Sequence, residues 1–385
     1  MVKFAHIADI HLGGWKQQPL QDLNLRSFKI AVDNCISENV DFVLFAGDLF
    51  DSPYPSIDIL KETFVEFKKL NEAKIPCFMI AGSHDYSVSG KTFLDVLEKT
   101  GFCKNVTDFE ETEEEIILKP VICKDIAIYG FPGKKTGLEV KDLRKIKLQD
   151  SSLFKILMLH TTLDRVVGDL PIDYVDSSKL PKVDYYALGH IHVLYNKDKF
   201  VYPGPIFPNN FVELEDLHHG HFCIVDTSKE NYLRRIKIKI KETELLTFEV
   251  KDTLTATEEI ISELEKRDIT DKIVLLRVKG ELEKGKNSDI DFQKIEKFAK
   301  DNGAYFMLKN THDLKTKEVD LEFEIEETEN VEEETIKIYS EQNPSDFNSL
   351  IPQLVNSLSI EKQEGETSEN FTKRILEESK KILKF

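Results

Sequence analysis

Five short apolar runs in the first 225 residues are each followed, within a few positions, by an acidic or histidine side chain. The runs are Val2–Ala8, Phe42–Ala46, Cys77–Ala81, Ile156–Leu159 and Tyr185–Leu188. Apolar runs of this length predict buried strands, and the helix-spaced apolar residues between them predict α-helices. Strands that alternate with helices form an α/β fold, whose ligand sites gather at the carboxyl ends of the strands. We therefore expect a polar site at one edge of a buried sheet.

The side chains that follow the runs suit divalent metal ions. They are Asp9, His11, Asp48, Ser83, His84, Asp85, His160, His190 and His192. Imidazole and carboxylate together favour Mn²⁺, Fe²⁺ or Zn²⁺ over Ca²⁺. In an extended segment, Asp9 and His11 point to one side and can hold a single ion, as can His190 and His192. Because the carboxylate of Asp48 can bridge two cations, the pattern predicts a two-metal site, which is suited to in-line displacement at phosphorus.

The charge balance limits how the chain could bind nucleic acid. It has 52 basic and 70 acidic residues, a net charge of −18, which argues against binding DNA by bulk charge, because neutralising phosphates needs clustered Lys and Arg. Local basic segments remain candidates for DNA contact, with an ordinary solvated face as the alternative. The candidates are Lys134, Lys135, Lys141, Arg144, Lys145 and Lys147 in one segment, and Arg235, Lys237, Lys239 and Lys241 on one face of a predicted strand.

The pattern changes along the chain and predicts four parts. Residues 1–230 form the α/β domain, and residues 231–325 alternate strand and helix in a small α+β domain. Residues 326–345 are an acidic linker, and residues 346–385 carry two amphipathic helices. The helices either dock another chain or pack onto their own domain. Their apolar stripes comprise Phe347, Leu350, Ile351, Leu354, Val355 and Leu358, and then Phe371, Ile375, Ile382 and Leu383.

The cysteines and the hydropathy favour an intracellular protein. Five cysteines are scattered without a CxxC pair, which is typical of reduced core residues. No apolar run reaches the ~18 residues of a membrane span, and the first residues lack the apolar region of a signal peptide. We expect a cytoplasmic protein that does not bind membranes.

The polar clusters resemble a known set of motifs. Asp9-Ile10-His11, Gly47-Asp48-Leu49-Phe50-Asp51, Gly82-Ser83-His84-Asp85, His160 and Gly189-His190-Ile191-His192 resemble the DxH, GDxxD, GNHD, H and GHxH motifs of calcineurin-like metallophosphoesterases. Within that superfamily, the opening Phe4–Gly13, Ala187–His192 and Tyr202–Gly204 are similar to double-strand-break repair nucleases of the meiotic-recombination-eleven (SbcD) type. The resemblance is strong over residues 1–225. Beyond them it rests on architecture alone.

The resemblance implies a fold and roles for the motif residues. The fold would be an α/β/β/α sandwich with a small capping domain that contacts DNA and C-terminal helices. Asp9, His11, Asp48 and His192 would hold the first metal, and Asp48, His160 and His190 the second. His84 would act beside the scissile phosphate, either protonating the leaving oxygen or stabilising charge. Ser83 departs from the usual Asn, so either it ligates the second metal weakly or a water takes its place.

The resemblance also implies an activity and partners. The activity would be that of a manganese-dependent nuclease in double-strand-break repair, a 3′-to-5′ exonuclease on duplex ends and an endonuclease on single strands or hairpins. The partner would be an SMC-like ABC ATPase whose long coiled coil binds the C-terminal helices; with it the chain would be nucleoid-associated when on DNA. A homodimer is also implied. Its candidate contacts, which ordinary core packing explains equally well, are Ile57, Leu60, Phe64, Leu94 and Leu97.

Two other functions remain open. A phosphomonoesterase or cyclic-nucleotide phosphodiesterase uses the same metals, although the ~150 residues beyond the catalytic domain would then need another purpose. A catalytically weak scaffold for the ATPase is the second, and Ser83 is the feature that favours it. Hydrolysis of p-nitrophenyl phosphates rather than polymeric DNA would indicate the small-molecule phosphoesterase. The metal content of the folded site would identify the scaffold, because a scaffold could lack the second ion.

Overall fold

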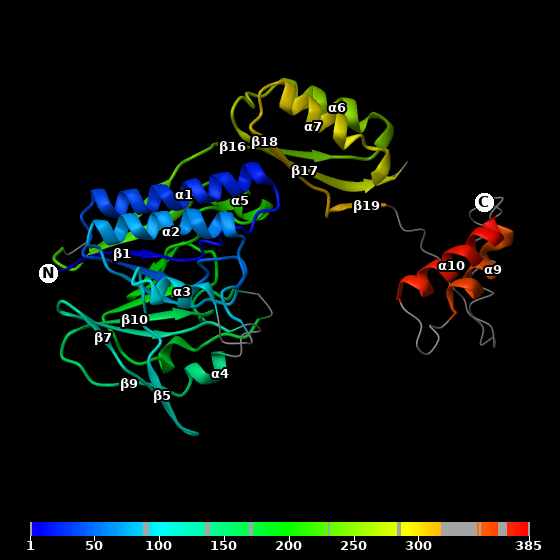
Figure 1. Ribbon diagram of the computed structural model, residues 1–385. Coiled ribbons are helices and arrows are strands. Elements are labelled where there is room, and N and C mark those ends of the chain that lie inside the picture. The colour runs from blue at the N-terminus through cyan, green and yellow to red at the C-terminus, as the bar shows by residue number, and fades with distance from the viewer. Residues whose placement is uncertain are drawn as a thin grey trace. The chain divides into compact units, whose positions relative to one another are not determined.

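The structure is a computed structural model (Figure 1). It describes residues 2–87, 92–134, 139–168, 172–229, 232–282, 286–316, 345, 348–360 and 368–383. The chain divides into two compact units, Met1–Lys317 and Glu318–Phe385. The acidic linker expected at residues 326–345 lies outside the described residues except for Ser345.

Two six-stranded sheets form the centre of the first unit. The first has the order β15 (Leu233–Ile238), β14 (Gly220–Asp226), β1 (Lys3–Ile7), β2 (Phe42–Ala46), β3 (Cys77–Ile80) and β4 (Lys104–Asn105). The second has the order β12 (Tyr195–Lys197), β13 (Phe200–Tyr202), β11 (Tyr185–Gly189), β10 (Phe154–His160), β8 (Ile126–Phe131) and β7 (Val121–Cys123). β1 to β4 are parallel to one another, as are β8, β10, β11 and β13. The carboxyl ends of the parallel strands therefore meet along one edge of each sheet.

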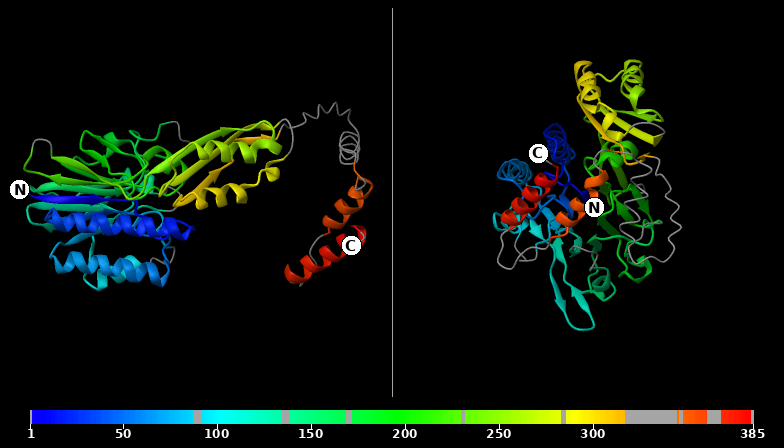
Figure 2. Two further views of the ribbon diagram at one scale, coloured as in Figure 1. Left: turned by 90° about the horizontal axis from the view of Figure 1, so that it is seen from above. Right: turned by 90° about the vertical axis from the view of Figure 1, so that its right-hand side faces the viewer.

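The continuous apolar runs arise because strands of the first sheet are buried on both faces. In β2, Phe42 and Leu44 face the second sheet, whereas Val43 and Phe45 face a layer of helices. That layer consists of α1 (Gln18–Ser37), α2 (Ile57–Glu72) and α3 (Phe93–Lys99), which cover the outer face of the first sheet (Figures 1 and 2). Alternating side chains thus serve two cores at once.

The outer face of the second sheet is covered differently. Its apolar residues pack against α4 (Glu139–Leu143) and a small sheet of β5 (Phe109–Glu111), β6 (Ile116–Leu118) and β9 (Ile146–Leu148). The expected α/β sandwich is confirmed, with a fourth layer that combines a short helix and a three-stranded sheet.

A four-stranded sheet follows the sandwich within the same unit. β16 (Thr243–Glu249), β17 (Ile273–Leu282), β18 (Phe306–Asn310) and β19 (Leu314–Thr316) are parallel, and α6 (Thr253–Glu265) and α7 (Phe292–Asp301) cover one face. Ile273 and Leu275 on the other face pack against Trp15, Leu20 and Leu214 of the sandwich, so one apolar cluster joins the two parts. Leu214 lies in α5 (Phe211–Leu217).

The second unit contains two helices that pack against each other, α9 (Ile351–Leu358) and α10 (Ser368–Leu383). Apolar side chains remain exposed on both, among them Val355, Leu358 and Leu376. Phe347, a predicted docking residue, lies outside the described residues. Within the part of the chain that the structure describes, no helix is long and apolar enough to cross a membrane.

Candidate metal centre

Backbone turns at the strand ends present the predicted ligands. Asp9, His11, Asp48 and His190 all have positive φ, at 53°, 49°, 52° and 104°. Such conformations are uncommon for residues with a side chain, and they concentrate at functional sites where the surrounding structure holds them. Each follows a parallel strand directly or by one turn, so the two sheets deliver these side chains to one place.

One group of predicted ligands combines Asp9, His11 and His192, whose ligand atoms lie within 4.8 Å of one another. The Nε2 atoms of His11 and His192 are 3.1 Å apart. Two nitrogens that coordinate the same ion, each at about 2.1 Å from it, lie at such a separation from one another. His11 Nε2 also lies 3.5 Å from Asp48 Oδ2, which connects this group to the next.

The second group combines Asp48, His160 and His190. His160 Nδ1 donates to the carbonyl of Ala46 at 2.9 Å, so its Nε2 faces Asp48 Oδ2 at 3.0 Å. Burial acts to lower the pKa of His160, yet Asp48 and Asp9 raise it to about 10. Burial and the charge on His160 lower the pKa of His190 to about 3. Without metal, Asp48 and His160 are therefore an ion pair, and His190 is neutral.

These two groups fit a pair of divalent ions. Asp9 Oδ2 is buried among the described residues without a hydrogen-bond partner. A buried polar atom that is left unsatisfied costs free energy, and a cation between the ligands would satisfy this oxygen. Imidazole with carboxylate suits a transition-metal ion such as Mn²⁺.

Carboxylates behind two histidines fix their orientation. Asp51 Oδ1 lies 3.0 Å from His11 Nδ1, and Glu213 Oε1 lies 2.8 Å from His192 Nδ1. A carboxylate on Nδ1 directs Nε2 toward the metal and makes it a stronger ligand. The sequence reasoning missed Glu213. Its only signal is Asn210-x-x-Glu213, which is typical of a helix start, and Asn210 does cap α5 by accepting a hydrogen bond from the Glu213 amide.

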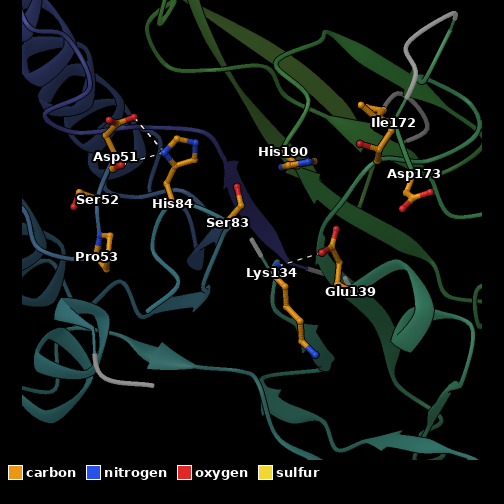
Figure 3. A pocket seen from close by; sticks show the side chains of 11 residues that line it. Asp51, Ser52, Pro53, Ser83, His84, Lys134, Glu139, Ile172, Asp173 and His190 are labelled. Carbon is orange, nitrogen blue, oxygen red and sulfur yellow. Dashed lines mark hydrogen bonds and ion pairs between the residues drawn. The ribbon is translucent and has the colours of Figure 1, made fainter. Parts of the chain in front are cut away.

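The predicted catalytic residue and Ser83 line a cavity of about 650 Å³ beside the ligands (Figure 3). His84 is exposed, and its Nδ1 donates to the Asp51 carbonyl at 3.0 Å, which leaves Nε2 for a substrate. The Ser83 hydroxyl lies 3.4 Å from Asp48 Oδ2. Asp85 accepts hydrogen bonds from the amides of Leu49, Phe50 and Gly82, so it joins two ligand-bearing loops.

The basic candidates for DNA contact lie in several environments. Lys134 forms an ion pair with Asp142 at 2.5 Å, and Lys135 lies outside the described residues. Lys141, Arg144 and Lys237 are exposed.

The remaining basic residues of β15 and the segment after it mostly have partners within the chain. Arg235 is half-buried and donates to the carbonyls of Tyr195 and Tyr202. Lys239 forms an ion pair with Glu242. The guanidinium of Arg235 is therefore engaged with backbone carbonyls of the second sheet.

The residues predicted as candidate dimer contacts differ in how deeply they are buried. Leu60, Leu94 and Leu97 belong to the core under the helical layer, which is the ordinary explanation for their spacing. Phe64 packs against the same core. Ile57 is 75% exposed, so it could contact another molecule.

The chain matches the family model described as calcineurin-like phosphoesterase over residues 2–194, half of its length. The matched region contains every predicted ligand from Asp9 to His192. The chain therefore belongs to the calcineurin-like phosphoesterase family. Membership confirms the expected metal-dependent hydrolase acting on phosphate esters, with divalent ions as cofactors.

Several curated relatives carry the same description, DNA double-strand break repair protein Mre11. The chain is 27% identical to that of Archaeoglobus fulgidus over 65% of this chain and 62% of the relative. It is 28% identical to that of Methanocaldococcus jannaschii over 76% of each chain. It is 30% identical to that of Saccharolobus solfataricus over 73% of this chain and 76% of the relative. These matches confirm the branch that the motifs indicated.

Proposed function

We propose that the chain is a manganese-dependent DNA nuclease in double-strand-break repair that hydrolyses phosphodiesters with two metal ions. The observation that carries the proposal is the pair of ligand groups, Asp9–His11–His192 and Asp48–His160–His190, joined through Asp48. It is supported by the similarity to Mre11 proteins over more than the phosphoesterase region. The proposed actions are 3′-to-5′ digestion of duplex ends and cleavage of single strands or hairpins.

The ligands would divide between the two ions as the motifs imply. Asp9, His11 and His192 would hold the first ion, His160 and His190 the second, and Asp48 both. Bound ions of this kind neutralise charge on phosphate oxygens and lower the pKa of water. His11, His160 and His192 present Nε2 as the ligand atom because Nδ1 of each is engaged with Asp51, Ala46 and Glu213, respectively.

His84 is the proposed acid for the leaving oxygen. Its Nδ1 carries a proton, because its partner is a backbone carbonyl that only accepts. In the charged ring, Nε2 also carries a proton and faces the cavity, where it can pass that proton to the oxygen that leaves phosphorus. The Asp51 carboxylate also lies 3.4 Å from His84 Nδ1.

The partners are proposed from the second unit and from the relatives. Exposed apolar residues on α9 and α10 supply a surface for the coiled coil of an SMC-like ABC ATPase. Leu358 is 58% exposed, so Leu358→Glu should prevent co-purification with the ATPase while leaving DNA cleavage by the chain alone unchanged. Loss of cleavage in this variant would contradict the separation of docking from catalysis. The homodimer and an intracellular location belong to the same proposal.

The test of the proposed activity is digestion of end-labelled duplex and single-stranded DNA by the purified chain. We expect cleavage with Mn²⁺, none with EDTA, and none by His160→Ala. Hydrolysis of p-nitrophenyl phosphates without DNA cleavage would instead identify a small-molecule phosphoesterase. Neither activity with fewer than two bound ions would favour the scaffold that Ser83 suggests, and neither activity with two bound ions would favour a nuclease that requires its ATPase.

A further inference from the structure

Glu139 is a buried carboxylate that none of the recognised motifs includes. It lies at the first position of α4 and is 2% exposed. Its Oε1 accepts a hydrogen bond from Thr161 Oγ1 at 3.1 Å, and its Oε2 accepts one from the backbone amide of Lys134 at 3.3 Å. Thr161 directly follows the ligand His160, so Glu139 is joined to the strand end that supplies the second metal group.

The described residues around Glu139 supply no ion-pair partner for its carboxylate. Among the described residues, no Lys, Arg or His forms an ion pair with Glu139. The nearby ammonium of Lys134 is paired with Asp142 instead. Buried charges in proteins are normally paired or coordinate metals, and two neutral donors do not replace a cation. The site therefore favours a positive charge within reach of this carboxylate.

The cavity that Glu139 lines is the place where a cation could lie close to its carboxylate. Glu139 lines the cavity together with Ser83 and His190. Figure 3 shows the Ser83 hydroxyl and the Glu139 carboxylate pointing into it from opposite sides, with His190 between them, while the Lys134 side chain points away. The second metal group has three ligands among the described residues, Asp48, His160 and His190, and Ser83 offers only a short neutral hydroxyl.

We propose that Glu139, rather than Ser83, supplies the remaining protein contribution to the second metal site, as an anionic group acting on the ion across the cavity. The inference rests on the proposed two-metal function and deepens it. It makes the second site more negative than one completed by a neutral side chain, which favours oxygen-preferring cations such as Mn²⁺ and Mg²⁺. It also gives the buried Glu139 carboxylate a counter-charge that no described residue supplies.

The test measures metal binding rather than activity. The full chain is stripped with EDTA and titrated with Mn²⁺, with calorimetry for affinity and electron paramagnetic resonance for the number of bound ions. We expect two ions for the unaltered chain. In Glu139→Gln we expect one site to weaken by about 10–100-fold, the range found when groups behind metal ligands are removed, and the other to keep its affinity.

Matched variants separate a metal role from a structural one. Thr161→Val removes the hydrogen bond to Glu139 but keeps the carboxylate, so it should lower stability and leave both affinities nearly unchanged. Ser83→Asn adds an amide ligand and should restore the weak site of Glu139→Gln. If Glu139→Gln does not fold, Glu139→Asp keeps the charge but withdraws it by one methylene, and the same loss at one site is expected.

The outcomes distinguish this inference from the two-metal proposal itself. Fewer than two ions in the unaltered chain would overturn both. Two ions with unchanged affinities in the folded Glu139 variant would overturn only the role of Glu139. Equal weakening in Thr161→Val and Glu139→Gln would do the same, because it would show that Glu139 merely holds the loop.

Discussion

Replacing Gly47 by alanine should damage the second metal site through a steric contact that the structure defines. Gly47 has φ +91°, and a Cβ at this position would lie 2.2 Å from His160 Nδ1 and 2.6 Å from its Cγ. Real Cβ atoms do not approach other atoms so closely, so the imidazole must move. Its Nδ1 is the atom that donates to the Ala46 carbonyl, and that hydrogen bond is lost with the movement.

Two costs add in this variant. Alanine in a left-handed conformation costs about 1–2 kcal/mol of stability. The broken hydrogen bond leaves a buried donor and acceptor unsatisfied, which costs about 1–3 kcal/mol more. Gly101→Ala is the matched control, because Gly101 has φ +78° and a Cβ added there would meet no described atom within 4 Å. The control therefore carries the backbone cost alone.

The assay is urea unfolding of both variants and the unaltered chain in EDTA, followed by Mn²⁺ titration. We expect Gly47→Ala to be less stable than Gly101→Ala by about 1–3 kcal/mol and to lose the weaker of its two metal sites. Gly101→Ala should keep both sites. Equal destabilisation of the two variants with unchanged metal binding would refute the role given to Gly47.

Three further predictions concern other parts of the chain. Glu213→Gln should weaken Mn²⁺ binding at the first site by about 10–100-fold, because His192 loses the carboxylate that orients it; unchanged calorimetric titrations would contradict this. His6 is buried, and burial lowers its pKa to about 3. The unfolded chain therefore takes up a proton between pH 6.5 and 3 that the folded chain does not, and stability falls with falling pH by about 1.4 kcal/mol per unit. Urea unfolding of His6→Gln in EDTA should lack this component, and a pH-independent difference between the two proteins would rule it out. Charge reversal at Lys134 and Lys135 should weaken DNA binding and flatten its dependence on salt; an unaltered salt slope would remove this segment from the DNA-binding surface.

The ligand groups could be predicted from the sequence because residues that follow parallel strands lie together at the carboxyl edge of the sheet. Once Asp9 and His190 each follow a parallel strand, the carboxyl edges of the sheets bring them together, and His190 N in fact donates to Asp9 Oδ1 at 2.8 Å. No comparable rule places Glu213 or Glu139. Each reads as an ordinary acidic residue in the first turn of a helix, and only the packing of that helix on the sheets turns its carboxylate inward.

The same limit explains the basic residues. Period-two alternation in the segment of Arg235 correctly predicts a strand, but it does not tell which face meets a second sheet. The strand adds to β14 at the edge of the first sheet, and there the guanidinium of Arg235 reaches the carbonyls of Tyr195 and Tyr202 in the second sheet. The sequence pattern thus shows which positions of the strand carry basic side chains. The packing of the two sheets determines which of these side chains are exposed to solvent.

The ligand carboxylates hold the site together in addition to facing the metal positions. One oxygen of Asp9 accepts the His190 amide, and one oxygen of Asp48 accepts the His84 amide, each at 2.8 Å. Each carboxylate thereby fixes a loop from another strand while its second oxygen faces the ligand group. Asp85 ties the Asp48 and Ser83 loops through three further amides. These hydrogen bonds give each ligand-bearing turn a partner within the protein that restrains its backbone.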